Sequence, residues 1–241
     1  LNALLGYEYT TFTNSGSNLK AYGNPDRGGF GNFGLDYTNY IQYSSVGART
    51  ITSFIDPFTA LQSVFGRAIF NYKERYLLTG TLRRDQSSKF GPDNRVGYFP
   101  SFSAAWDVSQ EDFLKSSKAL NQLKIRAGYG RTGNQEFPAG SAQSRYSFDN
   151  NGAQSPLNAA NPGLKWQSDA QYNAGVDFGF FDNRLTATVD YFYKTTTDLL
   201  FPTTPGEPRP SNAAIRWENL SGEIVNKGIE LALGTTIVNT A

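Results

Sequence analysis

The sequence predicts an all-β fold: a segment of an antiparallel transmembrane β-barrel that supplies about eight strands of a larger barrel. Three observations lead to this prediction. Apolar and polar residues alternate with a period of two, most alternating segments reach ten residues or more, and aromatic residues make up 15% of a chain whose mean hydropathy is −0.46. Strands of globular proteins peak at about five or six residues. A tilted strand needs about 9–11 residues to cross a bilayer.

The stretch 180–194, FFDNRLTATVDYFYK, shows the two faces of such a strand. One face carries Leu185, Ala187, Val189, Tyr191 and Tyr193, and the other carries Thr186, Thr188, Asp190 and Lys194. In an outer-membrane barrel the apolar face meets lipid and the polar face lines the lumen. A soluble β-sandwich alternates as well, so segment length and the placement of aromatic rings favour the barrel more strongly than alternation does.

Eight segments are expected to be strands: 1–10, 61–73, 75–86, 95–108, 121–133, 166–181, 183–200 and 226–238. Four of them show both faces clearly. The apolar faces carry Tyr76, Leu78 and Leu82; Phe102, Ala104 and Trp106; Leu123, Ile125, Ala127 and Tyr129; and Tyr172, Ala174, Val176, Phe178 and Phe180. Polar, charged or small residues occupy the alternate positions. We expect Tyr76, Tyr129, Tyr191 and Trp106 to belong to aromatic belts at the membrane interfaces.

The connections predict which end of the barrel faces which side of the membrane. Tight turns are expected near residue 74 and at Asp182, and long connections at 11–60, 134–165 and 201–225. This order fits the short periplasmic turns and long extracellular loops of outer-membrane barrels. The link 109–120 is predicted to be a short periplasmic helix, because Ser109 is followed three residues later by Asp112, which is close to a capping box.

The composition excludes several function classes. Lys and Arg number 22 against 21 Asp and Glu, so no nucleic-acid partner is expected. The chain has no Cys and no His, which removes thiolate chemistry and a Ser-His-Asp site within it. No cofactor and no metal site are expected. Because the sequence begins in the middle of an alternating pattern, we expect it to be a piece of a longer protein.

Several blocks resemble the barrel of SusC/RagA-type TonB-dependent transporters of Bacteroidota. They are NYKERYLLTGTLRRDQSSKFG, GYFPSFSAAW, LKIRAGYGRTGNQ, QYNAGVDFGFFDNRLTATVDYFYKTTTDLL and NKGIELAL, in the order of the family and covering most of residues 61–238. The resemblance implies a 22-stranded barrel in the cell outer membrane, closed by an N-terminal plug and capped by a SusD-like lipoprotein. Residues 1–241 would be a partial barrel domain without the plug. The TonB–ExbB–ExbD complex would act through the N-terminal part that this chain lacks.

Aromatic residues of the long connections are candidates for binding substrate. They are Tyr37, Tyr40, Tyr43, Tyr146, Phe148 and Trp166. Their rings can stack on sugar faces while nearby Asn, Gln and Asp bind hydroxyl groups, a mixture typical of ligand sites. The alternative, which weighs about equally, is that these rings pack the loops together or against a lipoprotein.

Charged residues of the polar faces form a second group of candidates. Arg83, Arg126, Asp177 and Asp190 are expected to face the lumen. A catalytic or anion site is suggested by Arg83, Arg84 and Asp85, which precede Ser87 and Ser88. The Asp177 and Asp190 carboxylates could act as acid and base. Charge pairing within the barrel is the favoured interpretation of both groups. Calcium binding in loops, at Asp93, Asp149, Asp182 or Asn183, lacks the regular spacing of a calcium loop, and Asp182-Asn183 is more simply a turn.

These observations favour import of an oligosaccharide or a peptide across the outer membrane, without covalent chemistry. Two alternatives remain open at this point. One is a small, closed eight-stranded barrel that serves as an adhesin or a structural protein, since eight is a permitted strand number. The other is an outer-membrane enzyme such as a protease or lipase, against which the absence of His argues.

Overall fold

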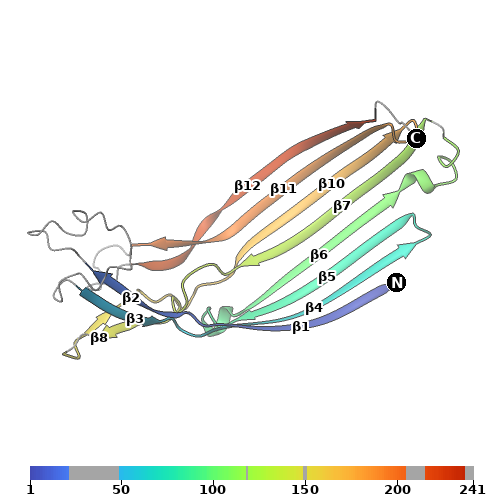
Figure 1. Ribbon diagram of the computed structural model, residues 1–241. Coiled ribbons are helices and arrows are strands. Elements are labelled where there is room, and N and C mark those ends of the chain that lie inside the picture. Colours follow the sequence, from blue (N-terminus) through green and yellow to red (C-terminus); the bar gives the residue numbers. More distant parts are fainter. Residues whose placement is uncertain (22–48, 118, 149–150, 205–214, 237–241) are drawn as a thin grey trace, which may run out of the picture. The chain divides into compact units, whose positions relative to one another are not determined.

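The computed structural model describes residues 1–21, 49–117, 119–148, 151–204 and 215–236, and these form two units (Figure 1). The larger unit, residues 1–10 with 59–241, is built on an eight-stranded sheet in the order β1-β4-β5-β6-β7-β10-β11-β12. Its strands are β1 (Asn2–Phe12), β4 (Thr59–Tyr72), β5 (Tyr76–Ser87), β6 (Val96–Asp107), β7 (Leu120–Asn134), β10 (Gln167–Phe180), β11 (Leu185–Thr203) and β12 (Arg216–Thr235). From β4 to β12 every neighbouring pair is antiparallel. All eight expected strands are therefore confirmed, and β1 and β12 are the two edges of the open sheet.

The smaller unit, residues 11–58, contains a strand pair that the sequence did not predict. Strands β2 (Ser15–Ala21) and β3 (Arg49–Ile55) pair antiparallel. The Asn14 side-chain amide donates a hydrogen bond of 2.7 Å to Asp56 at the open end of the pair. A second short pair, β8 (Tyr146–Phe148) with β9 (Gln154–Pro156), lies in the connection after β7 and was also missed.

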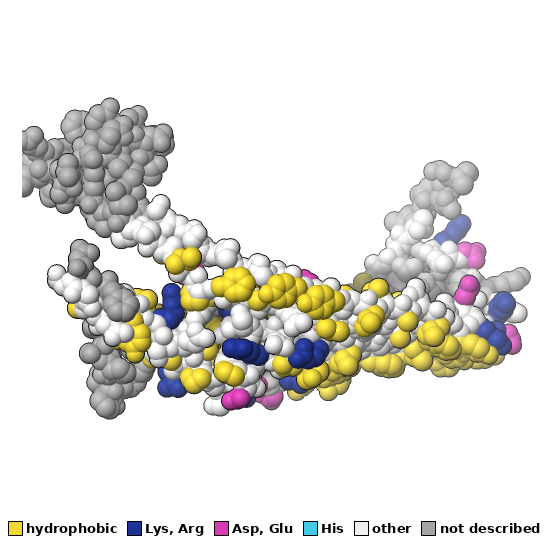
Figure 2. Space-filling model, turned by 90° about the horizontal axis from the view of Figure 1, so that it is seen from below, with side chains coloured by type: hydrophobic (Ala, Val, Ile, Leu, Met, Phe, Trp, Pro, Cys, Tyr) yellow, Lys and Arg dark blue, Asp and Glu magenta, His cyan; other side chains and the backbone are white. Residues whose placement is uncertain are grey.

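The register of the large sheet gathers the apolar residues on one face. Directly paired residues lie on the same face of a sheet, and the pairing runs unbroken from β5 to β12 along several rows. One row is Tyr76, Trp106, Ile125, Val176, Val189 and Leu231; the next is Leu78, Ala104, Ala127, Ala174, Tyr191 and Ile229. Many of these side chains are exposed, Ile229 by 74% and Leu231 by 65%, and hydrophobic side chains form bands along the strands in Figure 2. A contiguous apolar face of this size requires a covering phase or partner.

Tight turns close one end of the sheet where the sequence placed them. Lys73 and Glu74 both have positive φ (52° and 58°) between β4 and β5, and Phe181, Asp182 and Asn183 (53° to 60°) turn the chain between β10 and β11. Asn and Asp tolerate this left-handed region better than most residues, which supports the interpretation of Asp182-Asn183 as a turn.

The predicted helix over 109–120 was wrong. The segment instead contains a three-residue 3-10 helix, Val108–Gln110, followed by turns. The expected capping box does not form, because the Ser109 hydroxyl donates to Asp107 and Asp112 pairs with Arg75. A second 3-10 helix covers Pro92–Asn94.

The connection 201–225 is shorter than expected, since β11 and β12 extend past the alternating segment as a paired ribbon. A bulge joins the two parts: Thr197 pairs with Glu223, and the register then shifts so that Leu199 pairs with Leu220. Asp198 and Gly222 take positive φ (55° and 118°) at this point. Such a shift has no signature in a period-two pattern, which explains why the sequence did not reveal it.

Within the described ranges, no helix is both long and apolar enough to cross a membrane.

Candidate functional site

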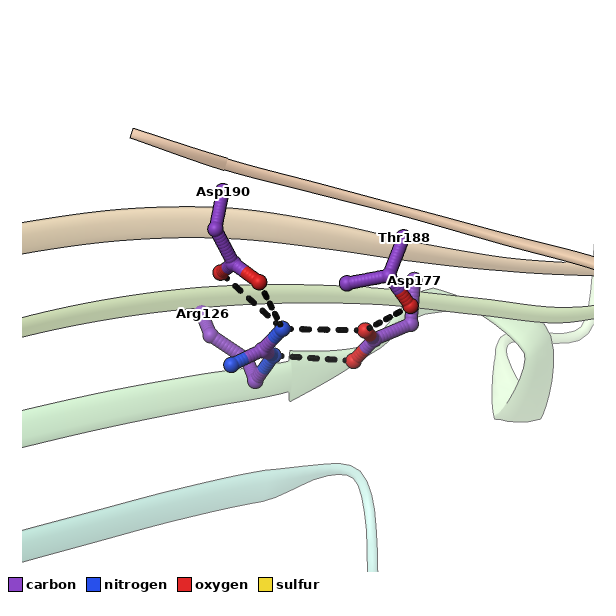
Figure 3. A network of polar contacts seen from close by, with 4 residues as sticks. All are labelled: Arg126, Asp177, Thr188 and Asp190. Carbon is purple, nitrogen blue, oxygen red and sulfur yellow. Dashed lines mark hydrogen bonds and ion pairs between the residues drawn. The ribbon is translucent and has the colours of Figure 1, made fainter. Parts of the chain in front are cut away.

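A charged network lies in the middle of the polar face, built from three adjacent strands (Figure 3). The guanidinium of Arg126 on β7 binds both oxygens of Asp177 on β10, at 2.8 Å from Nε and 3.0 Å from Nη2. Its Nη2 also lies 3.1 Å from an oxygen of Asp190 on β11. Thr188 donates a further hydrogen bond of 3.1 Å to Asp177. The register predicts this proximity, because Arg126 and Asp190 flank Gly175 on β10.

Gly175 makes this network possible. A Cβ atom at this position would lie 2.0 Å from an Asp190 oxygen and 3.0 Å from Nη2 of Arg126. Only the absence of a side chain lets Arg126 reach across β10 to β11. The two carboxylates therefore share one cation, which suits charge pairing and not the separated acid and base of a hydrolase.

Arg83, the fourth expected charge, lies on the same polar face, in a separate cluster near the β1 edge. It binds Asp85 at 2.7 Å, the Ser63 hydroxyl at 2.8 Å and Glu8 at 3.2 Å. Ser63 and Asp85 are buried, and the Arg83 guanidinium also lies over the Phe65 ring. With three oxygen partners from β1, β4 and β5, Arg83 joins strands together and has little capacity left for an anion.

Three adjoining depressions hollow the polar face along the central strands, with volumes of about 290, 300 and 530 Å³. Asn173 lines all three, and together they form what we call the polar trough. Its other polar lining residues include Gln171, Asp190, Lys194, Asn226 and Glu230. Alternation placed Gln171, Asn173, Asp190 and Lys194 on polar faces, but only the register showed that they adjoin one another and Asn226 and Glu230.

Lys194 forms a further ion pair in the trough. Its Nζ lies 3.3 Å from Asp169, which also accepts a hydrogen bond from Thr196. Gln171 and Asn173 bind one another at 2.8 Å and are exposed. The trough thus combines amide donors and acceptors with charges of both signs. Such a lining can bind a polar polymer through many hydrogen bonds.

The candidate Trp166 belongs to a packed cluster at the end of the sheet with the long connections. This rim cluster has Phe90, Phe137 and Leu164 as its buried centre, with Trp166, Leu200 and Trp217 packed against it. The Trp166 ring lies 4.9 Å from Phe90 and 5.4 Å from Phe99, and its indole N–H donates to the Arg95 carbonyl. Trp166 is therefore packed within the rim cluster, and ligand binding by its ring stays a prediction.

Lys89 covers one side of the rim cluster. Its ammonium lies 4.8 Å from the centre of the Phe137 ring and donates a hydrogen bond of 2.8 Å to the Gln135 carbonyl. Burial lowers the pKa of this ammonium, and the charge of Glu136 opposes that shift.

The remaining aromatic candidates lie apart from the rim cluster. Tyr146 is 48% exposed on β8, so its ring is available to a ligand. Phe148 ends β8, and its side chain lies outside the described part of the structure, as do Tyr37, Tyr40 and Tyr43 entirely. Ligand binding by these residues stays a prediction.

The opposite end of the sheet carries a network that the sequence did not reveal. Glu111 accepts hydrogen bonds from the Tyr76 hydroxyl (2.6 Å) and the Trp106 indole (3.1 Å), and pairs with Arg75 at 2.8 Å. The Tyr76 and Trp106 rings are stacked with centres 6.2 Å apart. The hydrogen bonds from Tyr76 and Trp106, with the charge of Arg75, lower the pKa of Glu111. This turn-end network fixes the polar edges of two rings that the sequence placed in an interfacial belt.

Within the described ranges, no group of three acidic residues lies together in a way that could hold a metal ion. Asp182 accepts a hydrogen bond from Asn121 in its turn, and Asp149 lies outside the described ranges.

Comparisons with known proteins agree with this geometry. A family model described as "TonB dependent receptor-like, beta-barrel" matches residues 2–239. TonB-dependent receptor P3 of Formosa agariphila is 34% identical over 248 residues, covering 98% of this chain and 23% of that protein. TonB-dependent receptor SusC of Bacteroides thetaiotaomicron is 36% identical over 191 residues, covering 75% of this chain and 19% of that protein. The chain thus spans about a quarter or less of the curated relatives that it matches.

Solved structures give the same result. The RagAB peptide transporter matches 98% of this chain and 25% of its own with a TM-score of 0.76 at 28% identity. The siderophore receptor PirA of Acinetobacter baumannii, 14% identical with a TM-score of 0.54, shares the fold.

Proposed function

This chain belongs to the TonB-dependent receptors as a stretch of their β-barrel, and from this membership we propose that it forms part of the wall of an importer of oligosaccharides or peptides. The barrels of this family lie in the outer membrane, where the apolar face of the sheet meets lipid. The single observation that carries the proposal is the polar trough on the opposite face. That face, with Arg83, Arg126, Asp177 and Asp190, would line the lumen.

The trough suits a ligand with many hydroxyl or amide groups. Gln171, Asn173 and Asn226 offer donors and acceptors side by side, and Lys194 and Glu230 add charges of opposite sign. An oligosaccharide or a peptide presents the matching groups along its length, whereas an apolar ligand would leave them unpaired at a cost in binding free energy. Tyr146, with Tyr37, Tyr40, Tyr43 and Phe148, would meet the substrate earlier, at the outer surface.

The proposed partners follow from the relatives. A SusD-like lipoprotein would cover the end of the barrel with the long connections, since the chain is similar to SusC and to the RagAB transporter. The TonB–ExbB–ExbD complex would supply energy through a part of the protein outside this chain. The matched relatives are receptors and transporters, and the protein is proposed to carry out no covalent chemistry.

The alternative of a small, closed barrel has less support. A closed barrel of eight strands needs β1 to pair with β12, but in the described sheet these two strands are the open edges and do not pair with one another. The enzyme alternative has less support as well. Arg126 forms ion pairs with both the Asp177 and Asp190 carboxylates, which are therefore engaged in charge pairing.

The test is uptake by cells that carry the whole gene. Deletion of the gene should abolish uptake of one pool of fluorescent probes, either mixed oligosaccharides or mixed peptides. Complementation with Asn173→Trp, which fills the trough, should restore less uptake than the wild type. Complementation with Ala174→Trp, the neighbouring residue on the lipid face, should restore it fully. If deletion leaves uptake of both pools unchanged, the import function is wrong.

A further inference from the structure

An aromatic ring interrupts the polar side of β11 inside the polar trough. From Thr186 to Thr196, the other positions of this side carry Thr, Asp or Lys, but Phe192 is apolar. Phe192 pairs with Asn173 on β10 and with Gly228 on β12, so these three residues share one face of the sheet. The ring is half-buried and lines the largest depression of the trough. A molecule in the trough therefore meets an apolar surface at this point.

Gly228 leaves the space that the ring occupies. A Cβ atom at this position would lie 2.9 Å from two carbon atoms at the far edge of the Phe192 ring. Any side chain larger than hydrogen would therefore push the ring out of its present position. The backbone of β12 thus supports the ring on one side, while the ring borders the trough.

Packing within the sheet does not account for this ring. Phe65 and Phe99 also lie on the polar face, but both have partners there. Phe65 lies under the Arg83 guanidinium, and Phe99 packs against Trp166. Within the described ranges, Phe192 neither stacks on another ring nor holds a cation over its face, and it lies outside the rim cluster. Apolar surface in a polar lumen costs free energy, which a ligand that covers the ring would recover.

Hydrogen-bonding side chains surround the ring on three strands. Neighbouring positions on one face of a sheet lie about 5–8 Å apart. For Phe192 these neighbours include Gln171, Asn173, Asp190, Lys194, Asn226 and Glu230. A pyranose sugar has C–H groups on its flat faces and hydroxyl groups around its edge. Stacked on Phe192, it would direct its hydroxyl groups towards these amides and charges.

We propose that Phe192 is the residue of the trough that selects sugar rings, by stacking on a pyranose of an oligosaccharide substrate. This inference rests on the proposed import function. A peptide backbone has no flat apolar face, so it would gain hydrogen bonds from the trough but little from the ring. Phe192 therefore distinguishes two substrate classes that the amide groups alone do not separate.

Uptake by cells that carry the whole gene tests the role of the ring. The probe is a fluorescent pool of neutral pyranose oligosaccharides, and the rate is measured over a range of concentrations. Phe192→Ala should raise the half-saturation concentration about tenfold and leave the maximal rate unchanged, because it weakens substrate binding only. Phe192→Leu keeps apolar volume without a flat ring and should behave as Phe192→Ala does. Phe192→Tyr keeps the ring and should behave as the wild type.

Two further variants serve as matched tests. Gly228→Ala leaves Phe192 in place but displaces its ring, and it should raise the half-saturation concentration as well. Phe102→Ala removes a ring from the lipid face, where Phe102 is 52% exposed, and it should leave uptake unchanged. Immunoblots of outer membranes confirm that each variant is present in equal amount.

Wild-type uptake by Phe192→Leu would overturn the proposal, because apolar volume alone would then suffice. A lower maximal rate at an unchanged half-saturation concentration would also overturn it, since that result indicates a structural role. If the cells import the mixed peptide pool and no oligosaccharide, the selection of sugar rings is wrong while import stands. If deletion of the gene changes uptake of neither pool, import itself is wrong and the role of Phe192 falls with it.

Discussion

Two tryptophans at opposite ends of the sheet are held in different ways. Trp106, at the end with the tight turns, lies on the apolar face, stacks on Tyr76 and donates its N–H to the Glu111 carboxylate. Trp166, at the end with the long connections, packs against Phe90 and Phe99 and donates to a backbone carbonyl. The Trp106 ring lies on the apolar face and is fixed by a carboxylate, whereas the Trp166 ring is part of a small core.

The difference shows how the two ends are stabilised. At the tight-turn end, the connection 108–119 supplies the Glu111 carboxylate, a charged hydrogen-bond acceptor that fixes the polar edges of the Tyr76 and Trp106 rings. At the other end, the connections supply Phe90, Phe137 and Leu164, which bury one another. Amino-acid substitutions test whether the two ends of the sheet are stabilised differently.

The largest effect is expected between the two ends, where the strands cross the membrane. Val189 faces outward and is 39% exposed, whereas its neighbour Thr188 faces the polar side and binds Asp177. Val189→Arg should lower the free energy of unfolding by roughly 2–4 kcal/mol, because an arginine near the middle of the bilayer loses its hydration. Thr188→Arg should cost much less. Urea unfolding of the full-length protein in lipid bilayers measures both, and equal costs would contradict the assignment of faces.

Truncation of the two tryptophans compares the ends directly. Trp166→Ala should destabilise the protein by about 3 kcal/mol, because it leaves a cavity beside Phe90 and Phe99. Trp106→Ala should cost less, since its ring is 36% exposed and loses mainly a stack and one hydrogen bond. The same unfolding experiment applies. A larger cost for Trp106→Ala would mean that the tight-turn end is the more strongly stabilised of the two.

A glycine under the rim cluster tests how tightly it is packed. A Cβ atom at Gly133 would lie 2.1 Å from the Phe99 ring and 3.0 Å from Trp166. Gly133→Ala should therefore cost about 2 kcal/mol, as overpacking of a core does. Gly80→Ala on β5 is the matched control, since no atom lies within 4 Å of its added methyl group. A neutral Gly133→Ala, measured by the shift in urea midpoint, would show that Phe99 is free to move.

Part of this structure could be predicted from alternation alone. The eight long strands, both tight turns and the faces of Trp106, Arg126, Asp177 and Asp190 depend on residues close together in sequence. A period of two states directly which side chains share a face. The register between strands could be predicted only roughly, from the agreement of the alternating patterns of several strands.

The parts that sequence reasoning missed depend on distant residues or on small irregularities. For Trp166 the sequence left ligand binding and loop packing equally open, because Phe90, which packs near it, comes from another connection and Phe137 from the far end of its own connection. The Glu111 acceptor was hidden in a segment expected to be a helix, where the Ser109 hydroxyl bonds Asp107 and caps nothing. The long reach of Arg126 over Gly175 needed the register of three strands. No local pattern carries that information.

The smallest expected effect is a local pH dependence at the tight-turn end. The pKa of Glu111 is lowered in the folded state, first by the hydrogen bond from Tyr76, then by that from Trp106 and by the charge of Arg75. Stabilisation from this carboxylate is therefore fully present above its unfolded pKa of about 4.3. It is lost as the pH falls through the lower folded value. Acidification should loosen the segment 108–117 before the rest of the barrel.

Hydrogen exchange followed by mass spectrometry measures this loosening, because the amides of Leu114 and Lys115 bond to the Glu111 carbonyl. The protection of this segment in the wild type should fall below about pH 4 relative to Glu111→Gln at the same pH, which corrects for intrinsic exchange. Asp112→Asn removes the exposed neighbour of Arg75 and should keep the wild-type profile. If Glu111→Gln and the wild type lose protection in parallel, the Glu111 carboxylate does not stabilise the Tyr76 and Trp106 rings. The rings at this end would then depend on lipid alone.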